Sequence, residues 1–259
     1  LFGYMDGNAI IENLNLTNSY IGGHKFVGSI AGYIQSGQIE KCSVIGTCHG
    51  TAYSGWEVIA GGLVGFNNGL INNCFCDVKV TSYGEIIGGM VGENNNTIRC
   101  SYTKGRVDGY GRLGGLVGIN NSKIEKCYSK TRLAEINSGF TTRGGLVGLS
   151  KNGQVNDSFW DIELSGDSTS FGGIGLTTSE MQDSSSYLFA GWDFMGEIIN
   201  GREDVWGMNK NVNSGFPFLK WQGYENTVQL ECQAPFTTVS NLLFDEISSN
   251  SIKLKSFKK

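Results

Sequence analysis

The strings GGLVGFNNGLINNC at 61–74, GGMVGENNNTIRC at 88–100, GGLVGINNSKIEKCY at 114–128 and GGLVGLSKNGQVNDSFW at 144–160 repeat one pattern. A Gly pair precedes two aliphatic residues and a third Gly, and a polar turn then leads to an Ile or Val. The third Gly recurs at intervals of 29, 33, 27, 26 and 30 residues, as Gly3, Gly32, Gly65, Gly92, Gly118 and Gly148. A unit of about 29 residues cannot enclose an apolar core alone and must stack on its neighbours.

The units favour strands over helices, because they are rich in Gly and Asn and contain short β-branched stretches such as 58–59 and 78–80. We therefore expect an all-β fold: a right-handed parallel β-helix (β-solenoid) of about six coils over 1–165, with an aromatic-rich C-terminal cap. Each strand would pair with its equivalent in the next coil, about 4.8 Å away, so like residues would form ladders over roughly 30 Å.

Three columns of residues set the expected register. The first is Leu1, Ile30, Leu63, Met90, Leu116 and Leu146; the second is Phe2, Ala31, Val64, Val91, Val117 and Val147; the third is Ile11, Ile39, Ile71, Ile98, Ile124 and Val155. Strict alternation along a strand would turn the first or the second column to solvent. The sequence therefore predicts a kink there, or a cover on the outer face.

Two kinds of turn recur in each unit. Asn-rich turns at 67–69, 94–96, 120–121 and 152–153 predict a coil corner in which these residues adopt positive φ. Gly pairs at 61–62, 88–89, 114–115 and 144–145 indicate either a second corner or a backbone packed too closely for a Cβ atom, and the sequence leaves both interpretations open.

The chain has seven cysteines. We expect Cys42, Cys74, Cys100 and Cys127 to share one interior column as free, buried thiols, because adjacent side chains in a ladder point parallel rather than towards each other. Leu14 and Ser158 occupy the same column at its ends, so the column is expected to require small to medium size rather than a thiol.

No metal or cofactor site is expected. Cys74 and Cys76 lie on one face of a strand, but no second pair has zinc-like spacing, His24 and His49 are the only histidines, and HExxH is absent. The calcium-binding nonapeptide is also absent, and the glycines at 172–175 lack the flanking strand and helix of a dinucleotide loop.

The four strings quoted above resemble the glycine-rich GLUG repeat, and the resemblance extends over about 1–221. That repeat occurs in bacterial surface proteins, in adhesins and in the non-catalytic region of immunoglobulin A protease-type metallopeptidases. The resemblance implies a repeat class but no particular activity. It also implies that any metallopeptidase part of a parent protein lies outside this chain.

The segment 166–221 is expected to cap the stack, since terminal coils must cover exposed apolar side chains and strand edges. It contains the aromatic residues Phe171, Tyr187, Phe189, Trp192, Phe194, Trp206, Phe216, Phe218 and Trp221. Thr177 with Glu180 forms a capping-box pattern that predicts one short helix over Met181 and Gln182. The strings at 175–178, 191–194 and 215–219 resemble the usual GLUG ending. The alternative is an aromatic ligand surface.

Beyond Trp221, residues 222–235 are expected to form a linker, and 236–259 a truncated β-sandwich segment or a tail. The string VSNLLFDEISSNSIKLKS at 239–256 resembles the first two strands of a fibronectin type III module, although Ser256 stands where that module carries a Trp. The chain begins inside a repeat, so we expect it to be part of a longer modular protein.

The composition argues against nucleic-acid and membrane functions. The net charge is −4, the pI is about 5.3, and the 20 basic residues are scattered along the sequence rather than gathered into a stripe. No apolar run approaches the roughly 20 residues of a membrane span.

Carboxylates that could serve in glycan cleavage are Asp157, Asp161, Glu163 and Asp167, and, further along, Asp193, Glu197, Glu203 and Asp204. Because they do not recur from coil to coil, we expect no enzyme and no catalytic residue. The expected function is a non-catalytic adhesin or stalk segment at the cell surface, presenting loops such as 48–56 and 108–112 to a host or cell-surface protein or glycan. The alternative is a glycan-active β-helix enzyme, or the accessory region of a secreted protease.

Overall fold

The structure is a computed structural model that describes residues 1–51, 57–136, 141–225, 242–248 and 251–256. The chain divides into two units, Leu1–Val228 and Gln229–Lys259. Part of the expected linker, part of the loop at 48–56 and Cys232 fall outside the described residues.

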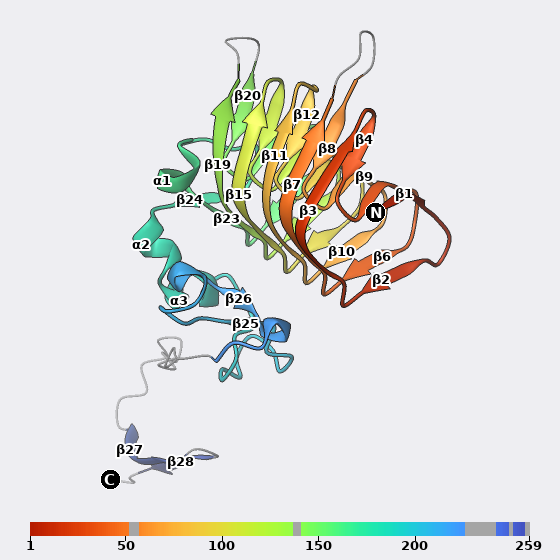
Figure 1. Ribbon diagram of the computed structural model, residues 1–259. Coiled ribbons are helices and arrows are strands. Elements are labelled where there is room, and N and C mark those ends of the chain that lie inside the picture. Colours follow the sequence, from red (N-terminus) through yellow and green to blue (C-terminus); the bar gives the residue numbers. More distant parts are fainter. Residues whose placement is uncertain (52–56, 137–140, 226–241, 249–250, 257–259) are drawn as a thin grey trace. The chain divides into compact units, whose positions relative to one another are not determined.

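The first unit is a parallel β-solenoid of about six coils, as the repeat predicts (Figure 1). Each full coil contributes one strand to each of four parallel sheets. Sheet A contains β1 (Phe2–Met5), β5 (Ala31–Ile34), β9 (Val64–Asn67), β13 (Val91–Asn94), β17 (Val117–Asn120) and β21 (Val147–Ser150). Sheet B contains β2 (Ile10–Glu12), β6 (Gln38–Glu40), β10 (Leu70–Asn72), β14 (Ile98–Arg99), β18 (Lys123–Glu125) and β22 (Gln154–Asn156).

The other two sheets complete each coil. Sheet C contains β3 (Asn15–Gly23), β7 (Ser43–Gly50), β11 (Phe75–Ser82), β15 (Tyr102–Gly109), β19 (Tyr128–Glu135), β23 (Phe159–Asp161) and β24 (Ile174–Leu176). Sheet D contains β4 (Phe26–Gly28), β8 (Ile59–Gly61), β12 (Ile86–Gly88), β16 (Arg112–Gly114) and β20 (Thr142–Gly144). Ile71 pairs with both Ile39 and Ile98, and Val64 pairs with Ala31 and Val91, so the predicted register is confirmed.

The backbone bends where the chain passes from sheet D to sheet A. The amides of Leu63 and Val64 both donate to the carbonyl of Met90, at 2.8 and 3.1 Å, and the same double donation recurs in the coils on either side. Because of this bend, Leu63 and Val64 are both fully buried in one core. The predicted kink is therefore present.

The Gly pairs stand at this same bend. A Cβ atom on Gly61 would lie 2.7 Å from the backbone nitrogen of Gly92 and would meet the carbonyl of Val64. None of the paired glycines has positive φ. Glycine is needed here because the backbone of the neighbouring coil is too close for a side chain. The pairs also stand at a corner, so both interpretations hold.

The prediction of positive φ at the Asn-rich turns was wrong. Asn67, Asn94 and Asn120 have ordinary φ values and form a fully buried ladder between sheets A and B. The side-chain amide of Asn67 donates to Asn94 Oδ1 at 2.8 Å, and the side-chain amide of Asn94 donates to Asn120 Oδ1 at 2.9 Å. Asn94 also donates to the carbonyl of Asn96, two residues ahead, at 2.7 Å. The side chains close the corner by replacing backbone hydrogen bonds.

Positive φ occurs instead between sheets B and C, in every coil. The residues are Asn13, Lys41, Asn73, Cys100, Lys126 and Asp157, with φ between 46° and 57°. Each of the first five donates its amide hydrogen to a carbonyl of the next coil, as Cys100 does to Glu125 at 3.0 Å. The stack therefore holds even Lys and Cys in a conformation that their side chains disfavour.

The placement of Cys100 in the interior column was also wrong. Cys100 occupies the positive-φ corner, and Ser101 takes the column position beside Cys74. The register of the next residue fixes this, because Phe75 pairs with Tyr102.

The C-terminal cap is present and covers two surfaces. Residues 162–176 cross the last coil, where the Phe171 amide donates to Val147 O and the Ile174 amide to Ser158 O. This part includes α1 (Ile162–Ser165), and it is followed by α2 (Thr178–Met181) and α3 (Ser184–Leu188) (Figure 1). The capping box of Thr177 and Glu180 is confirmed. The remainder, with the antiparallel pair β25 (Trp206–Gly207) and β26 (Phe218–Leu219) and 3-10 turns at Asn213–Gly215 and Lys220–Gln222, lies against the outer face of sheet C.

The second unit contains an antiparallel pair, β27 (Leu242–Ser248) and β28 (Ser251–Ser256). In the described part of the chain, no helix combines the length and the apolar character that crossing a membrane requires.

The asparagine ladder generates a stability prediction. Asn94→Ala removes two bonds of the ladder and leaves the facing groups of Asn67 and Asn120 buried without their partners, so we expect a loss of about 1–3 kcal/mol in unfolding free energy. Urea denaturation followed by circular dichroism measures it. Asn152→Ala, at an exposed turn of the last coil, is the matched control and should change stability by less than about 0.5 kcal/mol. Equal losses for the two variants would contradict a structural role for the ladder.

Candidate functional site

The outer face of sheet C carries an aromatic column at the start of its strands. Phe75, Tyr102, Tyr128 and Phe159 are paired in register, and Tyr102 stacks on Tyr128 with ring centroids 4.9 Å apart. All four are buried. Parallel stacking on this scale provides large apolar burial, but only if something covers the column.

The cap provides this cover. Trp206 contacts both Tyr102 and Tyr128, at 6.3 and 6.0 Å between centroids, and Trp192 contacts Phe159 at 5.9 Å. The Tyr128 hydroxyl donates to Pro217 O at 2.6 Å, and Tyr102 donates to Gln222 at 3.1 Å. Burial raises the pKa of both tyrosines well above the ordinary value. The rings of Tyr102 and Tyr128 are therefore packed under the cap, and their hydroxyls are hydrogen-bonded to it.

The cap aromatics are therefore mostly packing residues and do not form an open aromatic ligand surface. Those that are buried are Tyr187, Trp192, Phe194, Trp206, Phe216 and Phe218. Phe171 and Phe189 are exposed, and Trp221 is half-buried with its indole N–H donating to Asn73 O at 2.8 Å.

The residues of the first predicted set of carboxylates stabilise local structure. Asp161 is fully buried and caps α1, accepting from the amides of Glu163 and Leu164 at 2.9 and 2.8 Å, while its other oxygen accepts from the Thr178 hydroxyl. Glu163 accepts the Thr178 amide hydrogen at 2.9 Å, and this bond lowers the pKa of Glu163. Asp167 pairs with Arg143 at 2.8 Å, and Asp157 occupies a positive-φ corner.

The residues of the second predicted set of carboxylates lie in the cap. Glu197 accepts from the amides of Ile199 and Asn200, and Asp204 pairs with Lys220 at 2.9 Å. Asp193 Oδ2 accepts the backbone amide of Glu203 at 3.0 Å. The structure brings Asp193 and Glu203 to one cleft, which does not include Glu197 and Asp204.

This cleft of about 490 Å³ lies between the corner of sheets B and C and the cap. Its lining is Cys100, Lys126, Asp193, Asn200, Gly201, Arg202, Glu203, Val205 and Trp206. Lys126 lines the cleft and donates to Gly191 O of the cap at 2.5 Å. Burial raises the pKa of the Cys100 thiol to about 11, so Cys100 is protonated and a poor nucleophile at neutral pH. The lining combines donors and acceptors suited to holding a polar molecule.

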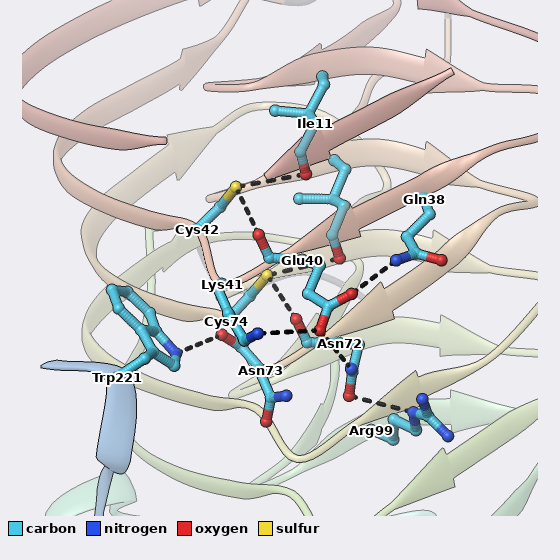
Figure 2. A network of polar contacts seen from close by, with 11 residues as sticks. Ile11, Gln38, Glu40, Lys41, Cys42, Asn72, Asn73, Cys74, Arg99 and Trp221 are labelled. Atoms are coloured by element: carbon cyan, nitrogen blue, oxygen red, sulfur yellow. Dashed lines mark hydrogen bonds and ion pairs between the residues drawn. The ribbon is translucent and has the colours of Figure 1, made fainter. Parts of the chain in front are cut away.

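The interior sulfurs cap the corner that precedes them (Figure 2). Cys42, Cys74 and Cys127 each donate to the carbonyl two residues earlier, at 3.2, 3.2 and 3.3 Å. Ser101 and Ser158 donate to the equivalent carbonyls at 2.8 and 2.7 Å. In the coils where Cys or Ser occupies the column, its residue is therefore a small hydrogen-bond donor as well as a residue of suitable size.

The thiols of the described residues are free: Cys42, Cys48, Cys74, Cys76, Cys100 and Cys127. Burial raises the pKa of Cys48 to about 12 and those of Cys74 and Cys76 well above the ordinary value. The hydrogen bond from Cys74 lowers the pKa of Cys42. Figure 2 shows Cys42 and Cys74 one above the other, beside the polar chain of Gln38, Glu40, Asn72 and Arg99.

Among the described residues, no three His, Cys, Asp or Glu side chains come together in a way that could hold a metal ion. No family model, curated protein or solved structure matches the chain. The resemblances to the GLUG repeat and to a fibronectin type III module therefore remain expectations.

Sequence reasoning missed two features of this region. Counting three residues from Ile98 to the column, or aligning the aromatic residues Phe75 and Tyr102, would have placed Ser101 correctly. The cleft had no local signal, because Cys100 and Lys126 are far in sequence from Asp193 and Trp206.

The thiol environments predict an alkylation pattern. At pH 8, Cys48 in the folded protein holds about a thousandfold less thiolate than in the unfolded chain, because its pKa is raised to about 12 from 9.0. Iodoacetamide labelling followed by peptide mass mapping should therefore leave Cys48, Cys74 and Cys76 unmodified in buffer and modify them in urea. Equal labelling in the two conditions would contradict sealed interior thiols.

Proposed function

We propose that the chain is a non-catalytic segment of a cell-surface adhesin or stalk. Its solenoid would serve as a stiff spacer that presents loops and sheet faces to a host or cell-surface protein or glycan. The extracellular location and the bacterial source are part of this proposal and are based on the resemblance to the GLUG repeat.

The observation that carries the proposal is how the carboxylates are engaged. Acid–base cleavage of a glycan needs two carboxyl groups that face a substrate and remain available for proton transfer or attack. Here Asp161 and Glu197 accept backbone amide hydrogens, while Asp167 and Asp204 are paired with Arg143 and Lys220. Side chains held in this way stabilise turns and helix starts.

The stacking itself favours a mechanical role. Each coil is hydrogen-bonded to its neighbours through four sheets, so a load along the axis is shared among many parallel backbone bonds. Apart from Cys100, which lines the cleft, the free thiols of the described residues lie inside the stack, where the apolar surroundings protect them from oxidants.

A second candidate is a glycan-active enzyme, because Asp193 and Glu203 both line one cleft. Asp193 is buried and already accepts the Glu203 amide, whereas the Glu203 side chain is exposed. The pair could meet a polar ligand, and this arrangement is the specific reason to test for turnover.

The test measures binding and turnover together. The chain is incubated with polysaccharide arrays and with bacterial and host cells, bound protein is quantified, and new reducing ends are assayed. We expect retention without new reducing ends, both for the unchanged chain and for Asp193→Asn. Release of reducing ends that Asp193→Asn abolishes would replace the proposal with the enzyme. Absence of binding to every cell and glycan would contradict the adhesin role.

A further inference from the structure

The stack gathers basic residues that are far apart in sequence. On the outer face of sheet C, Lys79, Arg106 and Arg132 pair in one column, and Lys104 pairs with Lys130 in the column two residues earlier. We call these five residues the basic face. Their sequence separations of 26 or 27 residues within a column hid the grouping, and the expectation that the basic residues are not gathered was wrong.

The basic face carries more positive charge than its acidic neighbours compensate. Asp77 pairs with Lys104 at 3.0 Å, and Asp108 pairs with Arg106 and lies 4.0 Å from Lys79. The ion pairs among the described residues include no carboxylate for Arg132, which is exposed. A third carboxylate, Asp161, acts on Lys130, so the five cations have three carboxylates near them in a chain whose net charge is −4.

This clustering of like charges destabilises the fold, so it points to a role other than stability. Like charges directly opposite each other on neighbouring strands are destabilising. Burial, together with the charge of Lys104, lowers the pKa of Lys130 to about 8. The positive charge at this position is thus held against an unfavourable environment, and the fold provides no compensating ion pair for Arg132.

The geometry is regular and open. Neighbouring strands are about 4.8 Å apart, so Lys79, Arg106 and Arg132 form a regular column. Lys130 is engaged by the cap, because it donates to Asn213 O at 2.7 Å. Lys79 and Arg106 have side chains 58% and 44% exposed, enough for both to reach a ligand. A regular column of cations is matched by a ligand that repeats its negative charges at regular intervals.

We propose that the basic face binds an anionic polysaccharide, with sulfate or carboxylate groups on successive sugars contacting Lys79, Arg106 and Arg132. This inference deepens the proposed function and rests on it, because it names the ligand class of an adhesive surface. Arg106 and Arg132 suit such groups, since a guanidinium can donate two parallel hydrogen bonds to one carboxylate or sulfate.

Two other anionic partners fit less well. Single-stranded nucleic acid is recognised largely by stacking bases on aromatic rings, and the rings beside the basic face, Tyr102 and Tyr128, are buried under the cap. An acidic protein segment would need a groove or an unpaired strand edge for its side chains or backbone, whereas Lys79 and Arg106 lie on strands that are paired on both sides. Arg132 lies beyond Tyr128 and Ser129, the two residues at which β19 pairs with β23.

The experiment compares two charge-matched variants of the whole chain. Lys79→Glu with Arg132→Glu changes the basic face, and Lys151→Glu with Lys210→Glu makes the same change in net charge at exposed lysines elsewhere. Binding to immobilised heparin, polygalacturonate and uncharged dextran is measured by surface plasmon resonance at several salt concentrations. Thermal unfolding of both variants checks that they remain folded.

We expect the unchanged chain to bind at least one of the two anionic polysaccharides, with affinity that falls as salt rises, and not to bind dextran. The basic-face variant should lose about tenfold or more in affinity, while the control should change by less than about twofold. The preference between heparin and polygalacturonate identifies sulfate or carboxylate as the favoured group.

Other outcomes would overturn the inference. Equal losses in both variants would show non-specific attraction, and tighter binding of a single-stranded oligonucleotide in competition would assign the face to nucleic acid. Absence of polyanion binding, with cell or neutral-glycan binding retained, would refute the basic face as a ligand site while leaving the adhesin role intact. Polyanion binding without cell binding would refute the adhesin role alone.

Discussion

The structure depends on backbone hydrogen bonds that run from each coil to its neighbours. A strand in this stack has no partner within its own coil, so its amides and carbonyls are satisfied only if the coils above and below stay in register. A shift of one residue would turn Ile71 and its equivalents away from the core and would break all four sheets at once. The side chains at each position are therefore constrained by their vertical neighbours more than by their neighbours in sequence.

At each of the three corners described above, the backbone turns from one sheet to the next, and different interactions hold each turn. At the bend between sheets D and A, the absence of a side chain at Gly61 lets two backbones approach. Between sheets A and B, the Asn94 side chain replaces backbone bonds and links three coils. Between sheets B and C, a bond to the next coil holds a residue such as Lys126 at positive φ, and a small donor such as Cys127 caps the turn. Close stacking at the first corner requires Gly in each repeat and so leaves a mark in the sequence, whereas the third corner is set by a bond to the next coil and requires no one residue type.

This difference explains what could be predicted from the sequence. The aliphatic columns, the coil number and the capping box of Thr177 follow from spacing and local chemistry, and all three appear in the structure. The corner at Lys41 and Cys100 could not be found from propensity, because neither residue type favours positive φ and the cause is a carbonyl one coil away. The cleft and the basic face are likewise products of register and of cap placement, and neither is visible in any one segment.

The position of the cap on sheet C follows from the cost of burying charge. The cap covers the first position of the strands, where Tyr128 and its neighbours need shelter from water, and its edge lies beside the next outward position. Lys130 occupies that position at the edge of the cap. Its ammonium group donates to Asn213 O at 2.7 Å and lies 4.2 Å from the Phe216 ring centroid. Burial already lowers the pKa of Lys130 there. Extending the cap by one more position would place Arg106 and Arg132 under it, and burying unpaired guanidinium groups costs far more free energy than the additional apolar burial would provide. The register that aligns Tyr102 with Tyr128 under the cap therefore also aligns Arg106 with Arg132 in a column that the cap leaves exposed.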